Sequence, residues 1–262
     1  MFNLNQGLIS ALSFSAEWQI YLVLMIFVVL SIAVSYLLGS INTSIIISKV
    51  LYRDDIRKYG SGNAGMTNML RTFGGKAAIL VLVGDVLKVA LAIAFTGFLL
   101  GFYYEAGISF GDGYCYIAGL FAMLGHIFPI YYGFKGGKGV LATAAMALIL
   151  TPIPFLILLI IFVIIVAATR YVSLGSVTAA VLYPVVLNGY CNLVFGISPA
   201  IIALCTLIIA GVIVWAHREN LRRISERTER KLSFGKKNKE KIDDDKSEEN
   251  AENENSGDND EK

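Results

Sequence analysis

The sequence has little charge and few cysteines for its length. Only 16% of its 262 residues are charged, whereas an ordinary soluble domain has about 25%. The hydrophobic fraction is 56%, the mean hydropathy is +0.65, and several apolar runs approach the roughly 20 residues that cross a bilayer as a helix. These features exclude a water-soluble core and predict an integral membrane protein.

The three cysteines, Cys115, Cys191 and Cys205, are widely spaced, and each lies within an apolar run. This pattern indicates neither a disulfide framework nor a metal site, so we expect them to be small packing residues. Residues 1–17 contain no Lys or Arg. The first apolar run therefore lacks the basic start of a cleavable signal and is expected to remain in the mature protein.

Hydropathy predicts an all-α polytopic fold with seven transmembrane helices. Spans four and five form one apolar stretch that is divided only by Pro152 and Pro154, which favour a tight hairpin there. The half before this hairpin is short for a complete crossing. The predicted spans are 18–39, 76–101, 113–132, 139–152, 153–169, 174–195 and 199–216.

The positions of Lys and Arg orient these helices. With seven spans, and with Lys76 counted at the mouth of the second, every basic residue except Lys88 falls on one side of the membrane. Positively charged loops stay in the cytoplasm. We therefore expect the N-terminus outside, the C-terminus in the cytoplasm and the polar, functional segments at the cytoplasmic face.

The net charge of +2 hides a strong segregation of charge. Residues 240–262 hold 11 of the 20 acidic residues, whereas residues 1–239 carry 19 Lys and Arg against 9 Asp and Glu, a net of +10. The predicted organisation is a membrane domain over residues 1–235 and a disordered charged tail over residues 236–262, which has too few apolar residues to offset the entropy of ordering.

The first polar segment, residues 54–71, contains three glycines among Ser, Asn and Thr residues. Such a backbone can bend closely around an anion, and Arg57 could bind phosphate oxygens through two hydrogen bonds. A turn leading into a helix capped by Asn63 or Thr67 explains the same residues.

The second segment contains His126 and the run Lys135-Gly136-Gly137-Lys138-Gly139 before an apolar helix. Free glycine amides, a helix N-terminus and a Lys charge predict phosphate binding. The run lacks the spacing of a nucleotide-hydrolysing P-loop. The alternative is a tight turn whose lysines only set topology, and His126 alone indicates a structural residue.

The third segment joins Ser173, at the start of the sixth span, to His217 and Asn220, after the seventh. His217 and Asn220 would share one face of a continuing helix, and a His is a plausible acid, base or phosphate donor. An interfacial helix end anchored by Trp215 and basic residues is the alternative. Inside the second span, Asp85 and Lys88 are spaced to pair on one helix face, which indicates a structural or site-supporting ion pair or an ion path.

Together these stretches resemble the bacterial PlsY-type acyl-phosphate:glycerol-3-phosphate acyltransferases over roughly residues 18–232. The resemblance rests on Leu38-Gly39-Ser40-Ile41, residues 55–71, residues 125–140, and Arg170-Tyr171-Val172-Ser173 with His217-Arg218-Glu219-Asn220. It implies a seven-span enzyme that moves a fatty acyl group from acyl phosphate to the sn-1 hydroxyl of glycerol 3-phosphate. The products would be lysophosphatidic acid and phosphate, in the first step of phospholipid synthesis.

The resemblance also implies roles for individual residues. The catalytic set would be Ser61, Arg57, His217 and Asn220, and Glu229, Asp85 and Lys88 would be structural. Substrate binding would fall to the glycine-rich run and its polar neighbours, namely Lys135, Gly136, Gly137, Lys138, Gly139, Asn63, Thr67, Asn68 and Ser173. Asn42, Met66, Val89 and Arg227 depart from the usual family residues, which puts local helix packing in doubt more than activity.

Acyl phosphate is already activated, so this chemistry requires no metal, organic cofactor or covalent nucleophile. The expected partners are the two substrates, membrane lipids and an enzyme that produces acyl phosphate; no nucleic acid is expected. The expected location is the bacterial inner membrane, with multiple passes. Two other functions fit the composition: a transporter of a phosphorylated metabolite, and a non-catalytic protein that binds anionic lipid.

Overall fold

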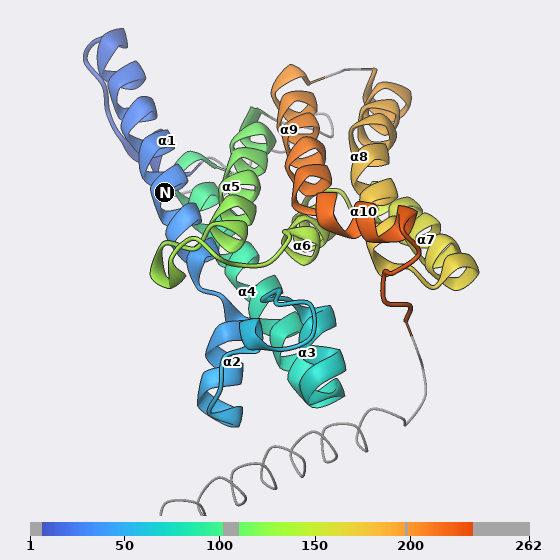
Figure 1. The fold of residues 1–262 in the computed structure, drawn as a ribbon. Helices are drawn as coiled ribbons and strands as arrows, with labels where there is room; N and C mark the ends of the chain where they lie inside the picture. The colour runs from blue at the N-terminus through green and yellow to red at the C-terminus, as the bar shows by residue number, and fades with distance from the viewer. Residues whose placement is uncertain (1–6, 102–109, 197–198, 233–262) are drawn as a thin grey trace, which may run out of the picture. The chain divides into compact units, whose positions relative to one another are not determined.

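The computed structural model describes residues 7–101, 110–196 and 199–232, and in these ranges all regular secondary structure is helical (Figure 1). The chain divides after Arg230 into two units, and the helices described below all belong to the first. The predicted tail, residues 236–262, lies outside the described residues.

In the described ranges the chain forms ten α-helices and three short 3-10 helices. The α-helices are α1 (Glu17–Ser40), α2 (Thr43–Tyr52), α3 (Met66–Phe73), α4 (Gly75–Leu100), α5 (Phe110–Ile127), α6 (Val140–Leu150), α7 (Pro152–Thr169), α8 (Val172–Phe195), α9 (Ala200–Ala216) and α10 (Arg218–Ser225). The 3-10 helices are η1 (Leu8–Ala11), η2 (Ile56–Lys58) and η3 (Ile130–Tyr132).

The helix lengths confirm a multi-pass membrane protein. Five helical segments of the described chain are long and apolar enough to cross a membrane, and the bent pair α9 and α10 would be a sixth. Helix α6, which matches the fourth predicted span, has only 11 residues. At 1.5 Å per residue it covers about half of a hydrocarbon core of about 30 Å. The described helices therefore provide five or six candidate spans, and the number of seven that hydropathy predicted stays a prediction.

The predicted proline hairpin is confirmed. Helix α6 ends at Leu150 and α7 begins at Pro152, so a single residue, Thr151, separates them. Proline suits the first turn of a helix because its missing N–H would have no partner there. The hydroxyls of Thr151 and Tyr116 also share a hydrogen bond of 3.0 Å, which ties the hairpin to α5.

Small residues let α1 approach α5 closely, as is common between membrane helices. A Cβ on Gly39 would lie 2.1 Å from the carbonyl oxygen of Ala122, and one on Gly125 would lie 2.3 Å from that of Tyr36. The main apolar core is built largely from α4, α5, α6, α8 and α9. This core holds the ends of α5, α6, α8 and α9 in fixed relation, and those ends carry the polar motifs.

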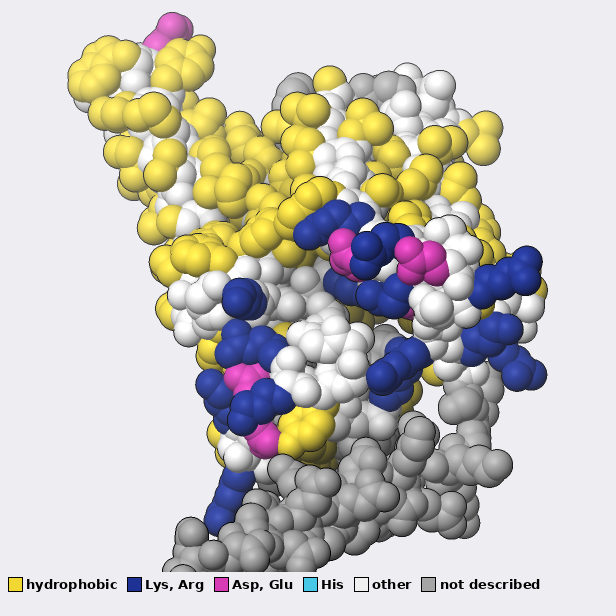
Figure 2. Space-filling view, in the orientation of Figure 1, with side chains coloured by type: hydrophobic (Ala, Val, Ile, Leu, Met, Phe, Trp, Pro, Cys, Tyr) yellow, Lys and Arg dark blue, Asp and Glu magenta, His cyan; other side chains and the backbone are white. Residues whose placement is uncertain are grey.

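Three short helices accompany the polar segments: α2 precedes the first of them, α3 lies largely within it, and α10 belongs to the third. Asn42 caps α2 by accepting a hydrogen bond of 3.1 Å from the amide of Ile45. Helix α3 begins after Gly65 without a side-chain cap, so the predicted cap at Asn63 or Thr67 is wrong. Figure 2 shows Lys and Arg side chains gathered over the same end of the first unit, while apolar side chains cover the opposite end.

Candidate active site

Residues from three separate stretches meet around the side chain of Asn220. Its amide nitrogen donates to the hydroxyl oxygen of Ser173 at 3.0 Å and to a carboxylate oxygen of Glu229 at 2.7 Å. The ammonium of Lys138 donates to the amide oxygen of Asn220. Arg223 completes the group, with its Nε 2.8 Å from the second carboxylate oxygen of Glu229. We call these five residues the Lys138 cluster.

Lys138 is the least neutralised member of this cluster. Burial lowers the pKa of Lys138 to about 8; the Glu229 carboxylate opposes this shift, and the positive charges of Arg223 and Arg71 reinforce it. Glu229 is bound to Arg223 and accepts from Asn220 and Ser173. The region therefore holds more positive than negative charge, and an anion beside Lys138 would be stabilised.

His217 lies at the bend between α9 and α10, where the helix axis turns by 53°. The single continuing helix that we predicted is therefore broken at this residue, although His217 and Asn220 are both buried. Burial lowers the pKa of His217 to about 4, and the charge of Lys138 adds to this effect. Its Nδ1 lies 2.8 Å from the carbonyl oxygen of Ile213. Because a carbonyl only accepts, Nδ1 carries the proton and Nε2 has a free lone pair.

The glycine-rich run is held against the end of α5. The amides of Gly136 and Gly137 donate to the carbonyl oxygens of Ile127 and His126, each at 3.1 Å. These two amides are therefore not free for phosphate, contrary to our expectation. Gly139 has a φ of 80° and caps α6, so Lys138 sits immediately before a helix N-terminus. The exposed side chain of Lys135 takes no part in the cluster.

The guanidinium of Arg57 is hydrogen-bonded to other groups of the protein. Its guanidinium makes two hydrogen bonds to Asp55, at 3.0 and 2.7 Å, and two to the carbonyl oxygens of Tyr132 and Lys135, at 3.0 and 3.4 Å. Hydrogen bonding to Arg57 lowers the pKa of Asp55 to about 2, although partial burial opposes the shift. Arg57 therefore fastens η2 to the loop after α5, and its predicted catalytic role stays a prediction.

Asn68 is likewise occupied by its own loop. Its side-chain oxygen accepts from the amide of Ser61 at 3.1 Å. Its amide nitrogen donates to the carbonyl oxygens of Tyr59 and Asn63, at 2.9 and 3.1 Å. Asn68 is buried and shapes the turn through Gly60 and Gly62, which have φ values of 61° and 69°. In the same segment the side chain of Ser61 is exposed, and those of Asn63 and Thr67 are half-buried.

Sequence reasoning missed two arginines near Lys138. Arg71, on α3, is half-buried, and its guanidinium donates to the carbonyl oxygen of Arg230 at 3.3 Å. Burial lowers the pKa of Arg71, an effect that nearby Glu229 opposes. Arg223 follows Asn220 by three residues. Helical spacing contains the signal for both, because Thr67 and Arg71, like Asn220 and Arg223, share a helix face.

A sequence model of the glycerol-3-phosphate acyltransferase family matches residues 29–227. This match covers far more than half of the chain and includes the Lys138 cluster except Glu229. The chain belongs to the glycerol-3-phosphate acyltransferase family.

Several similar proteins carry the family description. The glycerol-3-phosphate acyltransferase of Bacillus cytotoxicus is 40% identical over 80% of this chain and 98% of its own. That of Syntrophomonas wolfei is 42% identical over 76% of this chain and 93% of its own. A crystal structure of PlsY, an integral membrane glycerol 3-phosphate acyltransferase, in its glycerol 3-phosphate form has a TM-score of 0.67 and 31% identity, covering 79% of this chain and 96% of that one.

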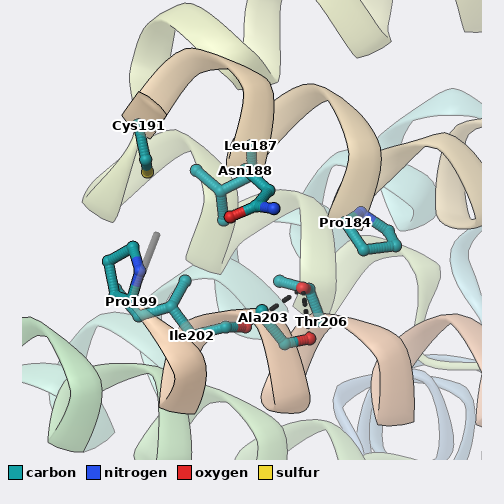
Figure 3. Close-up of a pocket in the computed structure, with 8 residues that line it drawn as sticks. All are labelled: Pro184, Leu187, Asn188, Cys191, Pro199, Ile202, Ala203 and Thr206. Atoms are coloured by element: carbon teal, nitrogen blue, oxygen red, sulfur yellow. Dashed lines mark hydrogen bonds between the residues drawn. The ribbon is translucent and has the colours of Figure 1, made fainter. Parts of the chain in front are cut away.

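The acyltransferase also has an apolar crevice between α8 and α9 (Figure 3). Its lining includes Pro184, Asn188 and Thr206, and the Thr206 hydroxyl donates within its own helix to the carbonyl oxygens of Ile202 and Ala203. Asn188 is about 22 Å along α8 from Ser173. The crevice is therefore remote from the Lys138 cluster and belongs to the packing of the two helices.

Inside α4 the acyltransferase has the predicted ion pair, with Nζ of Lys88 2.8 Å from Oδ1 of Asp85. Both side chains are buried. His126, which we interpreted as structural, contacts this pair from α5. His126 in turn lies against Gly137 of the glycine-rich run, so the pair is linked to that run through the imidazole.

Proposed function

We propose that this acyltransferase moves a fatty acyl group from acyl phosphate to the sn-1 hydroxyl of glycerol 3-phosphate. The hydroxyl oxygen attacks the acyl carbonyl carbon, the new ester bond forms, and the bond between the acyl carbon and the phosphate oxygen breaks. The hydroxyl proton leaves with the phosphate. The products are lysophosphatidic acid and inorganic phosphate, which agrees with PlsY having been solved in glycerol 3-phosphate and lysophosphatidic acid forms.

The excess positive charge of the Lys138 cluster is the observation that carries this proposal. Lys138 lies within electrostatic reach of Arg223 and Arg71, with Glu229 as the opposing carboxylate. The phosphate of glycerol 3-phosphate beside Lys138 would be stabilised by this excess. Because half-buried charges interact more strongly than exposed ones, the same groups also stabilise negative charge that develops during acyl transfer.

The remaining side chains divide between the two substrates. Lys138, Asn220 and Ser173 hold glycerol 3-phosphate, with the helix N-terminus at Gly139 adding a favourable dipole. Ser61, Asn63 and Thr67 bind the acyl phosphate group together with Arg71, which takes the place that we had assigned to Arg57. Glu229 orients Asn220 and Ser173 through the hydrogen bonds that it accepts.

His217 orients the attacking hydroxyl. Its Nε2 accepts a hydrogen bond from the hydroxyl, which directs the oxygen lone pair towards the acyl carbon. A group with a pKa of about 4 is a weak base near neutral pH, and the departing phosphate is the stronger one. We therefore assign the proton to the phosphate and positioning of the hydroxyl to His217.

The distribution of charge supports a cytoplasmic site in the bacterial inner membrane. In the seven-span arrangement the N-terminus is outside. Helix α6 is then the short fourth span, and it packs against α4 and α5. Water-soluble glycerol 3-phosphate then reaches the cluster from the cytoplasm, whereas the acyl chain stays among the helices. We keep the division that composition predicts, with a membrane domain over residues 1–235 and a charged segment over residues 236–262, and an enzyme that makes acyl phosphate supplies the donor.

The test uses purified protein in lipid, with glycerol 3-phosphate and either palmitoyl phosphate or palmitoyl-CoA. We expect lysophosphatidic acid and free phosphate to appear together from palmitoyl phosphate alone. Turnover with the CoA ester would overturn the donor assignment. If the folded protein made no product from either donor but moved glycerol 3-phosphate into vesicles, the transporter alternative would replace this proposal.

A further inference from the structure

A buried ionic network lies beneath the proposed site and takes no part in the chemistry described above. Its members are Asp85 and Lys88 of α4 and His126 of α5, with exposed fractions of 1%, 4% and 3%. Nζ of Lys88 lies 2.8 Å from Oδ1 of Asp85, 2.9 Å from Nδ1 of His126 and 3.0 Å from the carbonyl oxygen of Ile41. An ammonium has three N–H groups, and here each has one acceptor.

These contacts determine the orientation of the His126 ring. A charged Lys donates hydrogen bonds and accepts none, so Nδ1 of His126 must be the acceptor of its bond with Lys88. The proton of the neutral ring is then on Nε2, on the opposite edge. Asp85 pairs with Lys88 and also accepts from the Thr43 hydroxyl at 3.1 Å. The network thus joins α4, α5 and the break between α1 and α2.

The Nε2 edge of His126 lies directly under both glycine-rich segments. A Cβ on Gly137 would be 2.0 Å from Nε2 of His126 and 2.9 Å from the carbonyl oxygen of Ala64. The amide of Gly137 also donates to the His126 carbonyl oxygen. Gly137 precedes Lys138, and Ala64 belongs to the segment that holds Ser61, Asn63 and Thr67. The imidazole is therefore in van der Waals contact with the point where the two segments meet.

We propose that Asp85, Lys88 and His126 form a positioning network that sets the two glycine-rich segments relative to each other, and with them the two substrate phosphates. The inference rests on the proposed function, because it assigns one phosphate to each segment. His126 and Lys88 are positioning residues here and touch neither substrate.

The cost of this network argues for such a role. Apolar residues of similar volume would hold α4 against α5 as well as a buried ion pair does, and often better, and charges within a span are expensive. An ammonium with three defined acceptors, however, fixes the direction of the imidazole. The glycine loop at Gly137 is packed on that ring, so it moves when the ring moves.

Two variants break the network at different points. His126→Gln keeps an N–H near the position of Nε2 but removes the aromatic acceptor of Lys88. The double variant Asp85→Asn/Lys88→Met removes both charges together, so that no unpaired charge stays buried. Thr96→Val is the control, because Thr96 is a buried polar residue of the same helix about two turns beyond Lys88.

The measurements are thermal unfolding, calorimetric binding of glycerol 3-phosphate, and KM and kcat with palmitoyl phosphate as donor. We expect folded variants in which the Kd and KM for glycerol 3-phosphate rise by up to about 100-fold, the effect of an error of about 1 Å in placement. The effects of the two variants should not multiply when they are combined, because both remove the interaction between Lys88 and His126. Thr96→Val should retain wild-type values.

Two results would overturn the inference. One is unchanged Kd and KM in folded variants, with activity falling only in proportion to the folded fraction, as a purely structural role requires. The other is multiplication of the two effects in the combined variant. Failure of the proposed function would give a different result, because wild-type protein would then make no product from palmitoyl phosphate. Calorimetric binding tests the inference without relying on product formation.

Discussion

Lys88 and Lys138, the two lysines of the described ranges whose side chains are not exposed, differ in how their charge is balanced. Lys88 is buried with a carboxylate and two further acceptors. Lys138 is half-buried, contacts the neutral amide of Asn220 and has arginines nearby. A lysine whose charge is balanced within the protein supports architecture, whereas one that lacks a contacting carboxylate is suited to bind an anion. The following predictions test that distinction, from the largest expected effect to the smallest.

Lys138→Ala should have the largest effect on the reaction. Loss of a preorganised charged donor costs about 100- to 1,000-fold in rate, so we expect kcat/KM to fall by that factor while the unfolding temperature rises or stays level. The exposed Lys76 at the start of α4 provides the matched control, and Lys76→Ala should keep wild-type kcat/KM. Equal losses in the two variants would contradict a specific role for Lys138.

Arg71→Gln should reduce kcat/KM by about 100-fold, because it removes a charged donor that we assign to the acyl phosphate. The KM for acyl phosphate should change more than the KM for glycerol 3-phosphate. A titration of both substrates in lipid vesicles would measure this split. If glycerol 3-phosphate were affected more, Arg71 would belong to the other phosphate.

The activity should weaken at alkaline pH. The pKa of Lys138 is lowered to about 8, so above about pH 8 the free enzyme loses the charge that binds phosphate, and kcat/KM for glycerol 3-phosphate should fall up to tenfold for each pH unit. In Lys138→Arg the side chain stays charged, and this alkaline decline should move to higher pH. An unchanged profile in this variant would assign the decline to another group.

Arg57→Gln should have the smallest effect on catalysis and act mainly on stability. A charge-assisted, bidentate pair is worth about 2 kcal/mol, and denaturation in detergent should show a loss near that size. The folded pKa of Asp55 is about 2, below its usual 3.8. The pair therefore stabilises the protein above about pH 4 and loses this contribution as the pH falls towards 2. The difference between wild type and variant should shrink there to the part contributed by the hydrogen bonds of Arg57 to the carbonyl oxygens of Tyr132 and Lys135.

Hydropathy predicted most of the membrane helices closely. The predicted spans 18–39, 153–169 and 199–216 differ by a residue or so at each end from α1, α7 and α9, because a bilayer imposes a minimum apolar length that is visible in the sequence. The two prolines placed the break between α6 and α7. Hydropathy did not establish that α6 crosses the membrane. It measures how apolar a stretch is, whereas the 11 residues of α6 are too few for a full crossing.

The roles of the arginines could not be predicted in this way. Arg57 and Arg71 have the same chemistry and lie in the same segment, and only packing shows that Asp55 and two carbonyl groups occupy the first. Asn68 was likewise predicted to bind substrate, although its amide is used within the loop. Side-chain hydrogen bonds of this kind join residues that have no regular spacing in the sequence.

By itself, the sequence determined the membrane class, most helix boundaries, the clustering of basic residues and the motifs that carry the family resemblance. These properties follow from local composition and from the constant thickness of a bilayer. Tertiary structure alone decided that Asp85 pairs with Lys88 while Lys138 contacts the amide of Asn220, which glycine amides are occupied, and that His126 lies beneath the junction of two loops. Such features depend on distances between segments far apart in the chain, which are set by how the helices pack.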